Sequence, residues 1–369
     1  MNSSGEKTAT APPILNGNRV GAPQRPLRVV LVTGSSGMLG QHVVRELQDH
    51  PTVEEVRLLD VWPFENRLGH RISKKTTEVV ASVCDTKAVR EAVRGADAVI
   101  HCAGLLPTTF TGDDAMFERV NVKGTENVVD ACLKENVAYL VYTSTVAVIR
   151  KDQPSGDEKR WYNGPYPETK ARAEKIICEA HKRSLKDGSH NLKTLVLRLP
   201  PVYGELDYVV VPAQIKWAKK MFKTIFKLGP GFQVIYAGNA ASVHVSALDA
   251  LSKNETLSGR CLVACDDTPV DFDASFGPLV EGHDIQIFPL PVPYWLMLVL
   301  AACTQCIVGV LGRPFPSVRR AQVLTPSTIR YVYGGALFDD SETRKELAWQ
   351  PKYSPQEAVR LSRKFYDTL

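Results

Sequence analysis

Apolar runs alternate with amphipathic stretches along most of the chain. Residues 28–33 form a β-branched run that ends at a glycine, which is typical of a buried parallel strand. Shorter apolar runs follow at 56–59, 98–101, 139–143 and 194–199, and stretches with helical spacing, such as 38–47 and 127–133, lie between them. The alternation predicts repeated strand–helix–strand units, and therefore an α/β fold with a doubly wound parallel sheet.

The same pattern sets the expected domain boundaries. Residues 1–27 contain Gly, Pro, Ser, Asn and Thr but no apolar stretch of the length that a signal peptide needs, so we expect a disordered tail there. We expect the doubly wound domain to occupy 28–199 and a smaller α/β lobe to occupy 200–369.

One segment of the second half is apolar enough to associate with a membrane. Residues 294–311 carry no charge, and their length of 18 residues is at the lower limit for a helix that crosses a bilayer. Tyr294 and Trp295 resemble interface anchors, and a basic collar follows the other end at Arg313, Arg319 and Arg320. We expect 294–311 to be a membrane-associating segment, with a buried core helix as the alternative.

A second segment has mixed basic and apolar character. Residues 215–227 interleave five lysines with Trp, Met, Phe and Ile. This composition fits a basic amphipathic helix lying on anionic lipid, and it fits equally well a solvated helix with one half-buried face.

Composition and charge narrow the class of protein. The chain has 369 residues, is 44% hydrophobic and has a net charge of +5, which is enough for a large core but too weakly basic to indicate nucleic acid as a partner. The 8 cysteines lie mostly in apolar runs, which favours reduced thiols in the cytosol. Cys303 and Cys306 have the spacing of a metal or redox pair, but no second pair follows, so we expect packed thiols and no metal.

The first strand runs into a glycine-rich turn that opens an amphipathic helix. Gly34, Gly37 and Gly40 recur at intervals of three residues. Such glycines permit positive φ and let backbone N–H groups approach a pyrophosphate at the positive end of the helix dipole. A tight packing turn is the alternative, but Asp60 ends the second strand 20 residues after Gly40, where a carboxylate binds the ribose hydroxyls. Turn and carboxylate together predict a dinucleotide-binding domain of the Rossmann type.

Asp60 also indicates which dinucleotide binds. A carboxylate repels a 2′-phosphate, and the neighbouring positions Ser35, Ser36 and Val61 are not basic, so we expect NAD rather than NADP. Asp85, after the next apolar run, is a candidate either for capping a strand end or for meeting the adenine.

A tyrosine and a lysine form a candidate acid–base pair. Tyr166 and Lys170 are four residues apart at the start of an expected helix, so both side chains lie on one face. A cation near a phenol lowers the phenol's pKa toward neutral pH and makes the phenolate available as a base. The strand before them ends in the hydroxyls Ser144 and Thr145, one of which can hold a substrate oxygen. Two histidines look structural: we expect His101 to pack beside the cofactor region and His244 to be a satisfied core residue.

Taken in order, these motifs resemble the extended short-chain dehydrogenases, from Arg28 to about Gly204. Three later stretches are similar to the 3β-hydroxysteroid dehydrogenase/Δ5-4 isomerase family: Arg198 to Gly204, Tyr236 to His244, and the apolar run that closes with 311–314. The resemblance implies that Tyr166, Lys170 and Thr145 are catalytic. Thr145 departs from the family's serine but keeps the hydroxyl, and Ser144 is the fallback.

The resemblance also implies a cofactor site, a substrate and a location. It implies NAD binding by Gly34, Ser36, Gly37, Met38, Gly40, Asp60, Asp85, Ala103 and Lys170. It implies oxidation of a 3β-hydroxy-Δ5 steroid or sterol, with isomerisation to the Δ4 ketone carried by resemblance alone, because we locate no second acid or base. It further implies contact with membrane lipid, an endoplasmic reticulum location with the catalytic domain in the cytosol, and compatibility with a homodimer.

Two rival functions stay open. Another extended relative, such as a sterol-4-carboxylate 3-dehydrogenase, would use the same residues on a different substrate. A binding protein that senses NAD would need the glycine turn and Asp60 but not the hydroxyl, tyrosine and lysine, whose retention in order argues against it.

Overall fold

The computed structural model describes residues 26–106, 114–151, 159–160, 165–229, 231–311, 326–335 and 337–369. Apart from Pro26 and Leu27, the expected disordered tail lies outside the described residues. The three arginines expected to form a basic collar after residue 311 also lie outside them.

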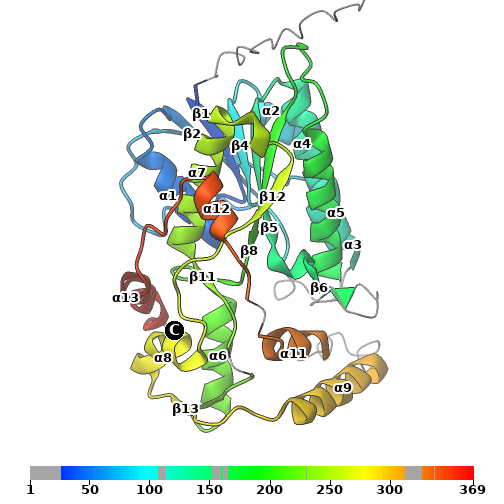
Figure 1. Ribbon diagram of the computed structural model, residues 1–369. Helices are drawn as coiled ribbons and strands as arrows, with labels where there is room; N and C mark the ends of the chain where they lie inside the picture. Colours follow the sequence, from blue (N-terminus) through cyan, green and yellow to red (C-terminus); the bar gives the residue numbers. More distant parts are fainter. Residues whose placement is uncertain are drawn as a thin grey trace, which may run out of the picture.

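A parallel sheet forms the centre of the molecule (Figure 1). In the described part of the chain it has seven strands in the order β12-β8-β5-β4-β1-β2-β3. The strands are β1 (Val29–Thr33), β2 (Glu55–Asp60), β3 (Lys75–Val80), β4 (Ala98–His101), β5 (Tyr139–Thr145), β8 (Lys193–Leu199) and β12 (Arg260–Val263). The order reverses between β1 and β4, and ligands of such sheets bind at the carboxyl ends of strands beside this switch point.

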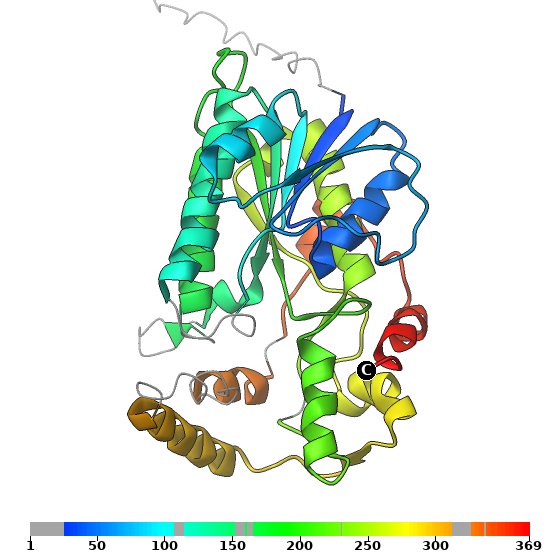
Figure 2. The same cartoon turned by 180° about the vertical axis from the view of Figure 1, so that it is seen from behind.

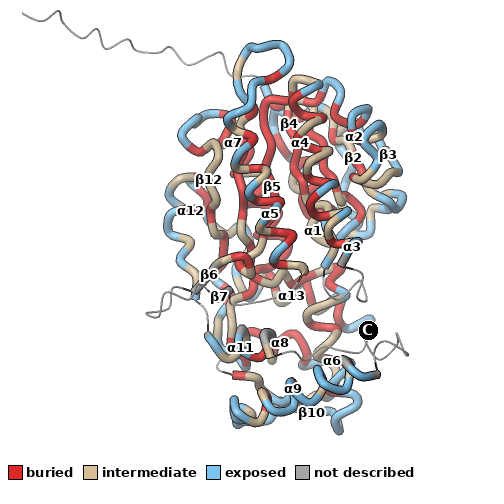
Figure 3. Tube along the Cα trace, turned by 90° about the vertical axis from the view of Figure 1, so that its right-hand side faces the viewer, coloured by how far each residue is buried: buried red, intermediate tan, exposed pale blue. Residues whose placement is uncertain are grey.

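Helices cover both faces of the sheet, as Figure 2 shows from behind. One face packs against α1 (Met38–Gln48) and α7 (Ala237–Lys253). The other packs against α2 (Thr86–Val93), α4 (Gly124–Lys134) and α5 (Pro165–Ala180). Successive residues of β1 point to opposite faces, so Val30 and Val32 join the first core and Leu31 the second. The buried residues concentrate in this layer (Figure 3), and the predicted doubly wound Rossmann fold is confirmed.

A smaller lobe lies below the carboxyl ends of the strands (Figure 1). Its core includes Tyr203, Ile215 and Phe276, packed between helices and short strand pairs. The elements are β9 (Val202–Tyr203), α6 (Val210–Lys220), β10 (Thr224–Phe226), β11 (Ile235–Tyr236), α8 (Phe272–Val280), β13 (Gln286–Phe288), α9 (Tyr294–Leu311), α11 (Pro326–Tyr333) and α13 (Pro355–Tyr366). The remaining short elements are α3 (Asp114–Phe117), η1 (Glu118–Lys123), η2 (Val146–Val148), β6 (Arg150–Lys151), β7 (Lys159–Arg160), η3 (Glu255–Leu257), η4 (Glu281–His283) and α12 (Ser341–Glu346).

The two units are interleaved along the chain. Helix α7 and strand β12 both follow residue 200, yet α7 packs against α1 and β12 pairs with β8 in the sheet. A boundary between residues 199 and 200 therefore does not separate the sheet layer from the smaller lobe, because α7 and β12 of the second half belong to the sheet layer.

The expected helix over 215–227 is shorter in the structure. Helix α6 ends at Lys220, and Phe222 and Lys223 both have positive φ, at 52° and 56°. This turn redirects the chain into β10, which pairs with β13. The lysines therefore lie in a helix, in a turn and just after a strand rather than in one continuous amphipathic helix.

Helix α9 spans the predicted apolar segment. Met297 and Ala301 are buried against Ile329 of α11, whereas Trp295 is 66% and Val310 is 73% exposed. Cys303 and Cys306 are also exposed, so the expectation that they pack as buried thiols is wrong. None of the helices in the described residues has the length and apolar character that crossing a membrane requires.

Candidate active site

The glycine turn after β1 is tightly closed. Gly34 has φ +72°, and a Cβ on it would lie 2.8 Å from the Cα of Ala103. A Cβ on Gly40 would lie 2.0 Å from the carbonyl oxygen of Gly34. Helix α1 begins at Met38, and its N-cap is Gly37, which has no side chain to bond the first N–H groups. The buried Ser35 hydroxyl has no hydrogen-bond partner among the described residues. A bare helix N-terminus with this close backbone approach fits a pyrophosphate.

Asp60 lies beside this turn at the end of β2. One carboxylate oxygen accepts a hydrogen bond from the Ser36 N–H at 3.0 Å, and the other accepts from the Trp62 N–H at 3.1 Å. The carboxylate is half-buried and retains lone pairs for a ribose. The loop after β2 also brings Arg67, whose guanidinium donates to the Ser36 carbonyl. The sequence analysis considered only positions next to the glycine turn and Asp60. It therefore missed Arg67, which the loop after β2 brings to the turn from farther along the chain.

Asp85 lies at the start of α2, and the loop after β4 lies against the glycine turn. The Asp85 carboxylate caps α2 by accepting from the N–H groups of Lys87 at 3.0 Å and Ala88 at 3.1 Å. Capping of α2 is thus what the structure shows, while adenine contact stays a prediction. The loop after β4 is held by Asn121, whose amide oxygen accepts from the Leu105 N–H at 2.8 Å.

Asn121 is a site residue to which the sequence reasoning gave no role. It lies in η1, a π-helical turn of the kind that often marks functional positions, and its amide also donates to Thr169 on α5 at 3.3 Å. It therefore ties the β4 loop to the helix that carries Tyr166 and Lys170. The periodicity of the sequence does not reveal the π-helical turn that places it.

Lys170 is buried against the end of β5. Its Nζ donates to the Thr143 carbonyl at 2.5 Å and lies 4.2 Å from the centre of the Tyr142 ring. Burial lowers the pKa of Lys170 to about 7, and Glu174 and Cys102 partly oppose this effect. Gly104 lies beside this ammonium: a Cβ there would be 3.3 Å from the Asn121 Oδ1 and in ordinary contact, at 3.9 Å, with Nζ.

Tyr166 begins the same helix one turn earlier and is half-buried. Its ring meets the Phe117 ring edge-on, with 6.5 Å between the ring centres. Phe117 fixes one side of the phenol, and helix α5 places Tyr166 and Lys170 on adjacent turns of one face.

The two candidate hydroxyls of β5 point to opposite sides. The Ser144 hydroxyl is buried and donates to Glu174 at 2.8 Å on the α5 side. Thr145 ends the strand, is half-buried, and accepts from the Ala147 N–H at 3.2 Å, which leaves its own proton for another acceptor. This alternation favours Thr145 over Ser144 as the hydroxyl at the strand end.

Both histidines near the site are buried and bonded at both ring nitrogens. His101 lies 2.6 Å from the Thr33 hydroxyl and 3.1 Å from that of Thr125, and burial lowers its pKa to about 3. His244 lies 2.8 Å from the Thr143 hydroxyl and 2.6 Å from the Ala240 carbonyl, and burial lowers its pKa to about 4. They pack as expected and connect strands to helices behind the site.

Comparison with known proteins assigns the family. The model of the 3-beta hydroxysteroid dehydrogenase/isomerase family matches residues 31–288. The chain belongs to this family. It is 31% identical to human 3 beta-hydroxysteroid dehydrogenase type 7 over 348 residues, covering 88% of this chain and 92% of that protein. It is 30% identical to the mouse protein of the same name over 357 residues, covering 91% and 94%.

Solved structures share the fold of this family member at low identity. A Thermus thermophilus UDP-glucose 4-epimerase, solved in complex with NAD, is 19% identical, with a TM-score of 0.62 and coverage of 92% of this chain and 98% of that one. Pal from Bacillus thuringiensis is 20% identical, with a TM-score of 0.65 and coverage of 92% and 99%.

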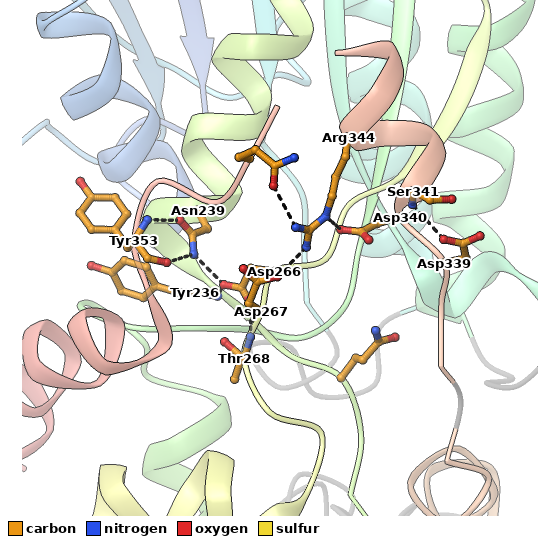
Figure 4. Close-up of polar contacts among 12 residues, drawn as sticks. Tyr236, Asn239, Asp266, Asp267, Thr268, Asp339, Asp340, Ser341, Arg344 and Tyr353 are labelled. Atoms are coloured by element: carbon orange, nitrogen blue, oxygen red, sulfur yellow. Dashed lines mark hydrogen bonds and ion pairs between the residues drawn. The ribbon is translucent and has the colours of Figure 1, made fainter. Parts of the chain in front are cut away.

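Residues 236–244, one of the stretches on which the family resemblance is based, also hold the structure together. Asn239, at the start of α7, donates to Asp266 and to the Tyr353 carbonyl, both at 2.9 Å (Figure 4). Asp266 also accepts from the Tyr236 N–H at 2.9 Å. These bonds join the sheet layer to the carboxyl-terminal segment. Within the described residues no cluster of three or more His, Cys, Asp or Glu side chains could hold a metal ion.

Proposed function

We propose that this protein oxidises the 3β-hydroxyl group of a Δ5 steroid or sterol to a ketone, with NAD⁺ as the acceptor. Membership of the family supports the reaction class of an NAD-dependent oxidoreductase. One observation carries the assignment of the site: the glycine turn and the acid–base pair share one edge of the sheet. Gly34 closes onto Ala103, and Ala103 precedes the glycine beside which the Lys170 ammonium lies.

In the proposed oxidation of the hydroxyl group, Tyr166 and Thr145 have separate roles. Tyr166, as the phenolate, takes the proton from the substrate hydroxyl. Thr145 donates a hydrogen bond to the same oxygen and fixes its position. When bound, NAD⁺ would supply the hydride acceptor for the carbon that carries that oxygen.

Lys170 supports this base through charge. Its Nζ is anchored to the Thr143 carbonyl, one helical turn from Tyr166, and its protonated form would favour the phenolate. The same Nζ would donate to a ribose hydroxyl of the bound cofactor. Ser36, Gly37 and Met38 offer the start of α1 to the pyrophosphate, and Asp60 accepts from the adenosine ribose.

Isomerisation of the Δ5 double bond belongs to the same proposal. It needs a second acid or base near C4 and C6 of the substrate, and we assign no residue to that role. Family membership is its support.

We further propose that the lobe contacts the cytosolic face of the endoplasmic reticulum membrane. On α9, Trp295, Val299 and Val310 are exposed apolar side chains. At the α6–β10 turn, Phe222 is 97% exposed and lies in the sequence between Lys220, which ends α6, and Lys223 of the turn. Apolar side chains beside lysines suit an anionic lipid surface, and a lipid-dissolved sterol would reach the site from there.

The deciding experiment offers the purified full chain, in detergent, NAD⁺ and a 3β-hydroxy-Δ5 steroid. We expect NADH absorbance to rise, and absorbance of the conjugated ketone to rise with it if isomerisation occurs. NADH formation only with 4-carboxysterols would assign the chain to sterol-4-carboxylate dehydrogenation instead. NAD binding without turnover on either substrate would identify a sensor.

A further inference from the structure

One ridge of α5 carries four functional side chains at intervals of four residues. They are Tyr166, Lys170, Glu174 and Cys178. Because the ridge crosses the sheet obliquely, the last three meet three successive strands. Lys170 bonds β5, Glu174 pairs with Arg198 of β8, and Cys178 meets Cys261 of β12.

The two thiols at the end of this ridge are in contact. The sulfur atoms of Cys178 and Cys261 lie 3.2 Å apart, although the residues are 83 positions apart in the chain. Both side chains are half-buried and reachable from solvent. A disulfide needs about 2.05 Å between sulfurs, so a small rotation of the two side chains brings them within bonding distance.

Local electrostatics distinguish the two sulfurs. Either thiol can donate in this contact. Donation from Cys261 lowers the pKa of Cys178, and Arg198 acts in the same direction, whereas burial and Glu174 raise it. The same hydrogen bond, with burial, raises the pKa of Cys261. By contrast, burial raises the pKa of Cys265 to about 12. The direction of these shifts favours Cys178 as the nucleophile of the pair and Cys261 as the thiol that resolves the mixed disulfide.

We propose that Cys178 and Cys261 form a redox-sensitive dithiol that closes to an intramolecular disulfide when it meets a disulfide oxidant such as oxidised glutathione. The Cys178 thiolate attacks one sulfur of the oxidant, forming a mixed disulfide and releasing one glutathione thiolate. Cys261 then loses its proton to solvent and attacks the Cys178 sulfur, which releases the second glutathione. The two protein thiols are oxidised by two electrons, and oxidised glutathione is reduced to two thiols.

Closure of the disulfide joins the helix of the acid–base pair to the edge strand of the sheet. Glu174, one turn before Cys178, pairs with Arg198 and accepts from the Ser144 hydroxyl at 2.8 Å. The cross-link therefore fixes the carboxyl-terminal half of α5 against β8 and β12. It also closes a long loop, which restricts the unfolded chain.

The test begins with the fully reduced, purified chain incubated anaerobically with oxidised glutathione. We expect intact mass to fall by about 2 units and a peptide map without reductant to show Cys178 linked to Cys261. The melting temperature should rise by several degrees and return to its starting value with dithiothreitol. Glutathione adducts without the linked peptide, or an unchanged melting temperature, would overturn the proposal.

Matched variants separate this pair from the other thiols. Cys178→Ser and Cys261→Ser should each abolish the cross-link and the thermal shift. The double variant Cys303→Ser with Cys306→Ser, in the exposed pair on α9, should leave both unchanged. If a serine variant does not fold, alkylation of the unaltered chain decides: oxidised glutathione should protect Cys178 and Cys261 together, and protection of only one contradicts the proposal.

Discussion

The Lys170 ammonium donates to the Thr143 carbonyl across 2.5 Å, which fastens the first turns of α5 to the end of β5. The bond satisfies a buried cation with a backbone oxygen rather than with a carboxylate. Burial consequently dominates, and the pKa of Lys170 falls to about 7. Burying the charged form of Lys170 therefore destabilises the folded state, and the folded chain releases this proton above about pH 7.

This cost predicts a pH-dependent stability. Between about pH 7 and pH 10.5 the unfolded chain binds a proton at Lys170 that the folded chain has released, so unfolding becomes harder as pH rises. Lys170→Met removes this dependence. We expect the melting temperature of the native chain, relative to that of the variant, to increase by several degrees from pH 7 to pH 9. Parallel melting curves across this range would contradict the burial of a titrating ammonium.

Tyr166→Phe tests the base. The substitution removes only the hydroxyl, and the ring contact with Phe117 is retained. Turnover should fall by about 10³-fold while the dissociation constant for NAD changes by less than about threefold. Tyr208→Phe, at an exposed tyrosine of the lobe, is the matched control and should leave both unchanged. A variant that retains its rate would show that the base is another group.

Asp60→Asn tests the discrimination between NAD and NADP. Asparagine keeps an oxygen that can accept from the Ser36 N–H but removes the charge, and Arg67 then supplies an unopposed cation nearby. We expect NAD affinity to fall by about tenfold and the preference for NAD over NADP to shrink. Fluorescence titration of both reduced cofactors measures this, with Glu65→Gln on the same exposed loop as control. An unchanged ratio would remove Asp60 from the ribose site.

The glycine turn offers a matched pair of substitutions. A Cβ at position 40 would meet the Gly34 carbonyl oxygen at 2.0 Å, whereas a Cβ at position 37 would lie 3.3 Å from the same atom. Gly40→Ala should therefore displace the turn and weaken NAD binding by about 100-fold or unfold the domain, while Gly37→Ala should cost about tenfold or less. Calorimetric titration and melting curves compare them. Equal effects would argue against a shared steric cause.

Membrane contact by α9 is tested without deleting the helix, because Met297 and Ala301 are part of a small core with α11. The double variant Val299→Glu with Val310→Glu should reduce co-sedimentation with phosphatidylcholine vesicles containing about 20% phosphatidylserine by about tenfold or more. Val80→Glu, at an exposed valine on the sheet, should have no effect. Persistent sedimentation of the double variant would move the anchor to the Phe222 turn.

The sequence predicted those parts of the fold whose signals are local. The β-branched run of β1, the glycines after it and the tyrosine–lysine pair on α5 all depend on spacing within a few residues, and the structure places each in the expected element. The alternation of side chains along β5 likewise directs the hydroxyls of Ser144 and Thr145 to opposite sides. The catalytic and cofactor roles of these residues stay predictions.

The features that the sequence missed depend on tertiary placement. Phe222 and Lys223 carry no turn signature, so the end of α6 at Lys220 was not foreseen. Arg67 reaches the glycine turn through a loop, and Asn121 reaches Leu105 through an irregular helical turn. The partnership of Cys178 and Cys261 exists only once β12 has joined the sheet.

The late arrival of β12 has a consequence for biogenesis. Strand β8 is complete by Leu199, but its outer neighbour comes only with Arg260–Val263. During synthesis on the ribosome, the nascent amino-terminal half therefore emerges with β8 paired to β5 on one side and with its other edge unpaired, where other chains can pair with it. A fragment ending at residue 199 should aggregate when expressed alone, and one extended through β12 should be better protected.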